Sequence, residues 1–127
     1  MDTKKEDIIY KDLSYKIIGL AMDVYNKMGY GFLEKVYENS LMFLFKRENI
    51  KAKQQAPVKV YFDGEVVGEY FADILVEDKI ILELKAIDKI IDAHKAQTLN
   101  YLKATGLRLA IILNFGKEKI EFERIVL

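Results

Sequence analysis

Three charged side chains stand in two segments that are otherwise strongly apolar. Asp73 interrupts the run 70–76, and Glu83 lies inside the run 80–84 with Lys85 two residues further on. Because side chains alternate between the two faces of a strand, Glu83 and Lys85 share one face. A buried carboxylate is unfavourable unless it is paired or bound to a metal ion. These residue types therefore indicate a candidate metal site.

The spacing of the two runs brings the carboxylates together. If residues 77–79 form a three-residue hairpin loop, Asp73 lies directly opposite Glu83. Facing carboxylates repel each other, and a hard cation between them reverses that repulsion. Mg²⁺ commonly takes one or two carboxylates together with water. The same spacing also fits a plain alternative, in which Glu83 and Lys85 lie on a solvated sheet face with Asp73 as a neighbour.

Two helical segments carry further polar groups at helical spacing. Glu34 and Tyr37 share one face at the start of a helix. His94, Gln97 and Tyr101 stand at positions i, i+3 and i+7 of a later helix, where an apolar stripe would be expected. An ordinary polar helix surface is the alternative for Gln97 and Tyr101, and a lone histidine is more often a surface or packing residue.

The periodicity of the apolar residues predicts the elements that must position these groups. Stripes at helical spacing predict helices, and alternation around the turn at Asp63-Gly64 predicts a hairpin. The predicted helices are residues 12–28, 33–48 and 92–106, and the predicted strands are residues 51–62, 65–76, 80–85, 107–113 and 119–126. The order α-α-β-β-β-α-β-β predicts an α/β fold with a mixed sheet flanked by helices.

Composition limits the classes of protein to consider. A chain of 127 residues, 51% of them hydrophobic, predicts a single domain over residues 1–127. The absence of cysteine excludes disulfides, thiol nucleophiles and thiolate zinc sites. The charged segment 1–7 is followed by no long apolar run, so we expect no signal peptide, no membrane association and a cytoplasmic location. Twenty basic and twenty acidic residues give zero net charge, which argues against coating of nucleic acid by bulk electrostatics.

These motifs together resemble a known family. The segment Gly31-x-x-Glu34-x-x-Tyr37 is similar to the motif of the GxxExxY family, a branch of the PD-(D/E)XK nuclease superfamily. Asp73 with Glu83-x-Lys85 resembles the catalytic core of the superfamily, and Gln97-x-x-x-Tyr101 resembles a motif of RecB-type exonucleases. Asn114-Phe115-Gly116 also looks like family sequence. The resemblance runs from about residue 17 to residue 126, and it implies a restriction-endonuclease-like core.

The resemblance also implies roles for individual residues. Asp73, Glu83 and the backbone carbonyl of Leu84 would bind Mg²⁺ or Mn²⁺, and Glu34 would complete the shell directly or through water. Lys85 would orient or help to deprotonate the attacking water. The side chains implied to contact the phosphate, the lysine or the substrate are Gln97, Tyr101, Tyr37 and His94.

Two functional hypotheses follow. The first is a Mg²⁺- or Mn²⁺-dependent enzyme that hydrolyses phosphodiester bonds in DNA. The second is a catalytically inactive nuclease-fold module that binds nucleic acid or a protein partner. A domain this small leaves little room for substrate selection, so a homodimer or a partner protein could supply it.

Overall fold

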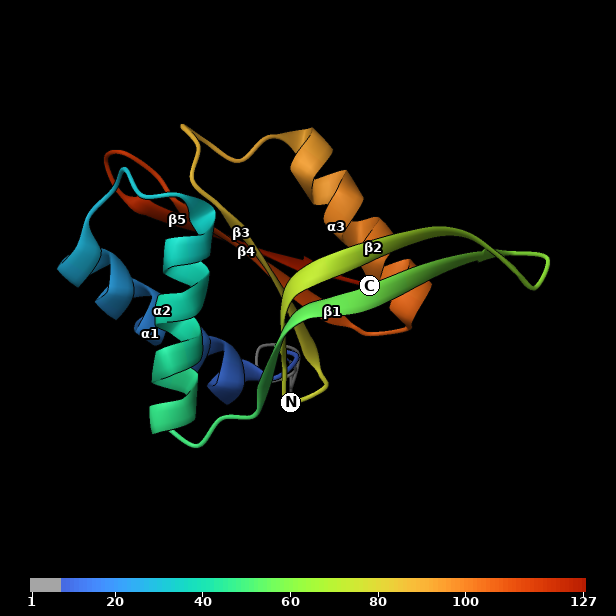
Figure 1. Ribbon diagram of the computed structural model, residues 1–127, viewed down its shortest axis with the longest axis horizontal. Coiled ribbons are helices and arrows are strands. Elements are labelled where there is room, and N and C mark those ends of the chain that lie inside the picture. The colour runs from blue at the N-terminus through green and yellow to red at the C-terminus, as the bar shows by residue number, and fades with distance from the viewer. Residues whose placement is uncertain (1–7) are drawn as a thin grey trace, which may run out of the picture.

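The computed structural model describes residues 8–127 and has the predicted order of elements (Figure 1). The charged segment 1–7, on which the expectation of no signal peptide depends, lies outside the described residues. The helices are α1 (Lys11–Met28), α2 (Glu34–Arg47) and α3 (Asp92–Thr105); the strands are β1 (Ala52–Phe62), β2 (Glu65–Val76), β3 (Ile80–Lys85), β4 (Leu109–Phe115) and β5 (Ile120–Val126). None of the described helices is long and apolar enough to cross a membrane.

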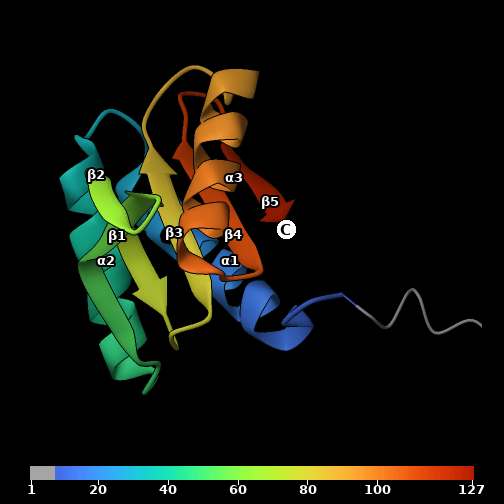
Figure 2. The ribbon, with the colours of Figure 1, turned by 90° about the vertical axis from the view of Figure 1, so that its right-hand side faces the viewer.

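The five strands form one mixed sheet in the order β1-β2-β3-β4-β5. Only β3 and β4 run parallel, and α3 makes the crossover between them. Helices α1 and α2 cover one face of the sheet, and α3 covers the other (Figure 2). The expected mixed sheet flanked by helices is therefore confirmed.

The loop between β2 and β3 has the predicted length of three residues. Val76 pairs with Ile80, and residues 77–79 make the turn. The register continues through Leu75 with Ile81 and ends at Ile74 with Leu82. Asp73 and Glu83 are the next two residues in this register, so they lie where the ladder between β2 and β3 stops.

The hairpin of β1 and β2 bends at this same point. In the ladder between β1 and β2, Gln54 pairs with Ile74 and Ala56 pairs with Ala72, so Gln55 lies across from Asp73. Gln55 has a φ of 53°, a left-handed conformation that is unusual in the middle of a strand. Ile74 packs on the side of α1 and α2, whereas Ala72 packs on the side of α3. Beyond the bend the hairpin arm, residues 56–72, packs against α3 and passes in front of it in Figure 1. The sheet is therefore split between β2 and β3.

Candidate active site

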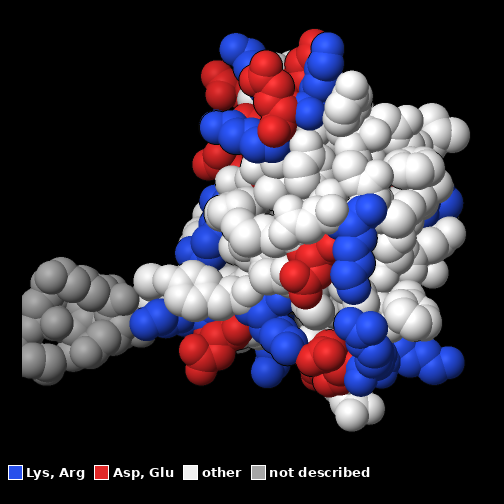
Figure 3. Space-filling view, turned by 90° about the vertical axis from the view of Figure 1, so that its left-hand side faces the viewer, with Lys and Arg blue, Asp and Glu red and all other residues white. Residues whose placement is uncertain are grey.

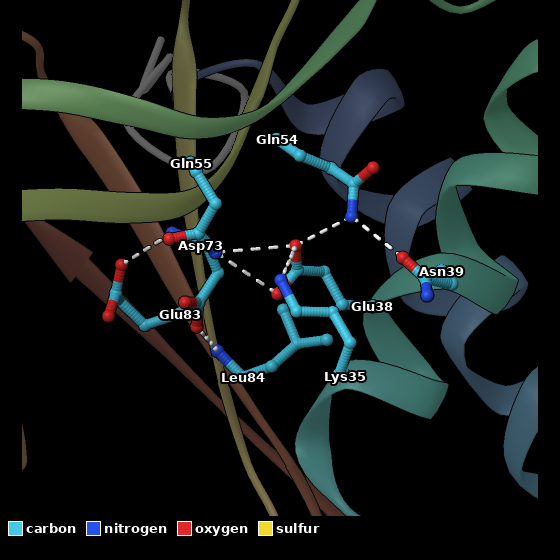
Figure 4. A network of polar contacts seen from close by, with 8 residues as sticks. All are labelled: Lys35, Glu38, Asn39, Gln54, Gln55, Asp73, Glu83 and Leu84. Carbon is cyan, nitrogen blue, oxygen red and sulfur yellow. Dashed lines mark hydrogen bonds and ion pairs between the residues drawn. The ribbon is translucent and has the colours of Figure 1, made fainter.

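Two carboxylates take the place of the ladder where β2 leaves β3. The Leu84 backbone N–H donates to Asp73 Oδ2 at 2.7 Å, and the Asp73 backbone N–H donates to Glu83 Oε2 at 3.2 Å. Backbone donors inside a fold need partners, and beyond the last ladder pair these side chains supply them. The structure therefore brings Asp73 and Glu83 into direct contact across the split (Figure 4).

Both carboxylic acids are harder to ionise than usual. Glu83 is only 8% exposed, and burial, followed by the charge of Asp73, raises the pKa of Glu83 to about 8. Burial also raises the pKa of Asp73, and the charge of Glu38 adds to the effect, while the Leu84 N–H opposes it. Two such acids in contact form a site that would gain from a cation.

Glu38 of α2 is a member of the site that the sequence reasoning missed. Its side chain is 3% exposed and accepts hydrogen bonds from Gln54 Nε2 at 2.6 Å, Lys35 Nζ at 3.1 Å and Gln55 Nε2 at 3.3 Å. Figure 4 shows the Gln55 amide between Glu38 and Asp73. Glu38 thus ties α2 to the bend in β1.

Lys85 and Glu34 lie at the margin of the carboxylate pair. Lys85 is half-buried at the end of β3, and its positive charge lowers the pKa of both Asp73 and Glu83. Glu34 is exposed at the first residue of α2, and its negative charge raises the pKa of Glu83. No group of three acidic or histidine side chains converges on a metal position among residues 8–127. A role for Glu34 as a ligand therefore stays a prediction.

The structure places Tyr37 in the core and not on a substrate surface. Its side chain is fully buried and stacks on Phe115 with ring centroids 4.3 Å apart. Its hydroxyl donates to the Gly29 carbonyl at 2.7 Å and accepts from the Phe32 N–H at 3.3 Å. Gly31, between these two, has a φ of 106°, which favours glycine. The motif of glycine and tyrosine therefore fixes the loop that leads into Glu34.

The three predicted residues of α3 have different surroundings. Tyr101 is buried and its ring lies 5.7 Å from that of Tyr70 on the hairpin arm. Gln97 is exposed and lines the same pocket as Tyr101. His94 Nδ1 accepts the Ile91 N–H at 3.1 Å at the start of the helix. His94 thus has a local capping contact, while Gln97 and Tyr101 face the hairpin arm.

Asn114 holds the segment that follows Lys85. It is fully buried, accepts the Ile87 N–H at 2.9 Å and donates to the Ile87 carbonyl at 3.0 Å and to Glu121 Oε1 at 2.9 Å. A Cβ at Gly116 would come within 3.1 Å of the Ile87 carbonyl, so a larger residue would require that carbonyl to shift by a few tenths of an ångström. Asn114 and Gly116 therefore position the exit of β3 through backbone contacts.

The residues of the split fit a hard divalent cation held by few protein ligands. Asp73 and Glu83 supply carboxylate oxygens from neighbouring strands, and among the described residues Glu83 accepts a single hydrogen bond, from the Asp73 backbone N–H. The charge of Lys85 only partly opposes the rise in both pKa values. Mg²⁺ is typically bound by one or two carboxylates, with water in its other positions. The donor set of this site matches that description.

Taken together, the fold and the site define an α/β domain with an acidic pair and a lysine at the open edge of its third strand. Comparison with known proteins agrees: the family model described as the PD-(D/E)XK nuclease superfamily matches residues 11–125. The chain belongs to this superfamily. No curated protein matches it significantly.

One solved structure, that of SSO0001, shares the fold. It superposes with a TM-score of 0.54 at 17% sequence identity, over 72% of this chain and 50% of its own. This chain therefore spans half the length of SSO0001. At this identity the likeness supports the fold alone.

Proposed function

We propose that the protein is a Mg²⁺- or Mn²⁺-dependent nuclease that hydrolyses phosphodiester bonds in DNA, and that it belongs to the GxxExxY branch of the superfamily. The observation that carries the proposal is the contact between Asp73 and Glu83 at the split, with Lys85 two residues along the same strand. The superfamily fold supports a hydrolase at this site.

The residues of the split have distinct roles in this proposal. Asp73, Glu83 and the Leu84 carbonyl hold the cation, and Glu34 contributes directly or through water. When bound, a divalent cation supplies Lewis acidity and lowers the pKa of its water. The Lys85 ammonium orients the attacking water and offsets charge on the phosphate as the P–O bond breaks.

Other side chains position the reacting groups. Gln97 and Tyr101 of α3 hold the phosphate from the side of the hairpin arm. Glu38 is a positioning residue, because it reaches Asp73 only through Gln55 and its own charge. Tyr37 is also a positioning residue, because its hydroxyl bonds the backbone of the loop that leads to Glu34.

Surface charge is consistent with local rather than bulk recognition of nucleic acid. On the side of the molecule where α1 and α2 lie, basic and acidic side chains stand next to one another and broad areas carry neither (Figure 3). Because the net charge is zero, we expect contact with a polyanion through a few defined groups and not through bulk charge.

The test is cleavage by the purified protein and its Lys85→Ala variant. Single-stranded, duplex, flapped and nicked DNA are incubated with Mg²⁺ or Mn²⁺, with RNA oligonucleotides in parallel. Lys85→Ala should lose about a hundred- to a thousandfold in rate, because the Lys85 ammonium acts on charge that develops on the phosphate in the transition state. Metal affinity, measured by titration calorimetry, should be largely kept. The matched control is Lys59→Ala, an exposed lysine of β1, which should cleave as the wild type does.

Each other outcome has a defined meaning. Trace cleavage that is equal in the wild type and in Lys85→Ala would come from a contaminating nuclease. Bound metal without cleavage of any substrate would contradict the enzyme and favour a binding module. Cleavage of RNA but not DNA would contradict the proposed substrate.

A further inference from the structure

A pocket lies between the hairpin arm and α3, next to the proposed active site. Its volume is about 530 Å³, within the range of small-ligand sites. The polar and aromatic residues that line it are Tyr61, Tyr70, Gln97, Asn100, Tyr101 and Lys103.

The pocket adjoins the catalytic strands. Tyr101 packs in one buried cluster with Ala72 and Ile81. Ala72 directly precedes Asp73, and Ile81 stands two residues before Glu83 on the same face of β3. Tyr101 therefore connects the pocket to the strand segments that carry the carboxylate pair.

One aromatic wall of the pocket is held in place before any ligand arrives. The Tyr70 ring tilts against that of Tyr101, with centroids 5.7 Å apart and an interplanar angle of 36°. Gly68 also lies near the Tyr70 ring: a Cβ added at Gly68 would be in ordinary van der Waals contact with it, 3.5 Å from Tyr70 Cε2. Tyr61, by contrast, is 57% exposed and free of such packing contacts among the described residues. It offers an open ring face at the mouth of the pocket.

The chemistry of the lining differs from that of the carboxylate site. Three tyrosine rings stand with two side-chain amides and one cation, and no acidic residue lines the pocket within the described part of the chain. Aromatic rings bind the faces of nucleobases, amides bind their edges, and a lysine pairs with phosphate. Polar aromatic lining of this kind suits a nucleotide better than it suits a purely apolar ligand.

We propose that this pocket binds one unpaired nucleotide of the DNA strand, next to the phosphate that is cleaved. The base stacks on Tyr61 and Tyr70, the Asn100 amide contacts its edge, and Lys103 pairs with the adjoining phosphate. A base inside a duplex cannot enter, because it must first leave its stack. The inference deepens the proposed function: the substrate is single-stranded DNA or an unpaired end or flap.

Because Lys103 is the only cation of the lining within the described part of the chain, binding in the pocket depends mainly on stacking. The contact of Lys103 with its phosphate should therefore contribute only about −0.7 to the slope of log K against log salt for single-stranded DNA. Lys103→Ala should flatten that slope further, whereas Lys59→Ala, at an exposed lysine of β1 outside the pocket, should leave it unchanged.

The decisive experiment measures binding of a fluorescent oligothymidine by anisotropy in EDTA, so that no cleavage occurs. Tyr61→Ala should weaken binding by about tenfold or more, and Tyr61→Phe should keep most of it, because the ring face remains. Phe62→Ala is the matched control: Phe62 is the next residue, it is exposed, and it does not line the pocket. An end-capped duplex should bind more weakly than the single strand.

Two results would overturn the inference: wild type that does not bind the single strand, or equal effects of Tyr61→Ala and Phe62→Ala. The outcome is separable from that of the nuclease proposal. Cleavage with binding insensitive to Tyr61 would refute the pocket and leave the enzyme. Binding sensitive to Tyr61 without cleavage by any metal would refute the enzyme and leave the pocket.

Discussion

The raised pKa of Glu83 predicts that the metal-free protein becomes less stable as pH rises from about 5 to 8. Burial and the charge of Asp73 hold the pKa of Glu83 at about 8 in the folded protein, against 4.5 for the ordinary side chain. The folded state therefore keeps a proton that the unfolded state has already lost. Stability from this proton is complete below the unfolded pKa and is lost as pH rises through the folded one.

The expected change is large against the total stability. Each pKa unit corresponds to about 1.4 kcal/mol, so the difference in Glu83 amounts to a change on the order of 5 kcal/mol. Small domains unfold with roughly 5–15 kcal/mol. The raised pKa of Asp73 acts in the same direction. The lowered pKa values of Glu48 and Asp78 act below pH 5 and leave this window unaffected.

The assay is urea denaturation followed by circular dichroism, in EDTA, at constant ionic strength between pH 5 and 8.5. Glu83→Gln removes the titration but keeps an oxygen that can accept the Asp73 N–H. Its free energy of unfolding should vary much less with pH and should exceed that of the wild type at pH 8. Glu69→Gln, at an exposed position of β2, is the control and should follow the wild type.

Two results would refute the reasoning. A wild type equally stable at pH 5 and pH 8 would mean that Glu83 ionises in contact with solvent. A Glu83→Gln variant whose stability falls in parallel with that of the wild type would assign the pH dependence to other groups.

The remaining predictions concern metal and the buried tyrosine. Mn²⁺ should raise the melting temperature, more at pH 8 than at pH 6 because it displaces a proton, with about 2.7 kcal/mol gained at a hundred times its dissociation constant. Asp73→Asn should lose most of this gain, and equal shifts in both proteins would contradict the site. Tyr37→Phe should destabilise the fold by roughly 1–3 kcal/mol, because the Gly29 carbonyl and the Phe32 N–H lose their partner. Urea denaturation measures this, and a loss no larger than that of the exposed Tyr15→Phe would contradict it.

Most of the fold was predictable from periodicity. Helical stripes and strand alternation placed the elements in the right order, with every boundary outside the fourth strand within one residue. The fourth strand was predicted two residues too early at both ends, since it spans Leu109–Phe115. The strand continues through the polar Asn114, because its amide is satisfied inside the fold by Ile87 and Glu121. A buried, fully bonded amide has no signature in a single sequence.

The site was predictable only in part. The length of the three-residue loop placed Asp73 opposite Glu83, because the register of a hairpin follows from its loop length. Glu38 has a recognisable pattern in the sequence, because it lies within the apolar stripe of α2, next to Tyr37 and three residues before Leu41, both fully buried. Gln55 left none, because its left-handed conformation arises from the bend of the whole hairpin.

That bend shapes both the carboxylate pair and the aromatic pocket. Where Gln55 turns the hairpin, β2 leaves β3, and the N–H groups of Leu84 and Asp73 take carboxylates in place of a neighbouring strand. The same bend carries the hairpin arm over α3, where Tyr70 meets Tyr101 and closes one side of the pocket. A flat hairpin would continue the ladder past Ile74, bury the carboxylates against backbone and leave α3 uncovered. The acidic pair and the aromatic pocket therefore both depend on this bend, and a substitution that straightens β1 at Gln55 should impair both together.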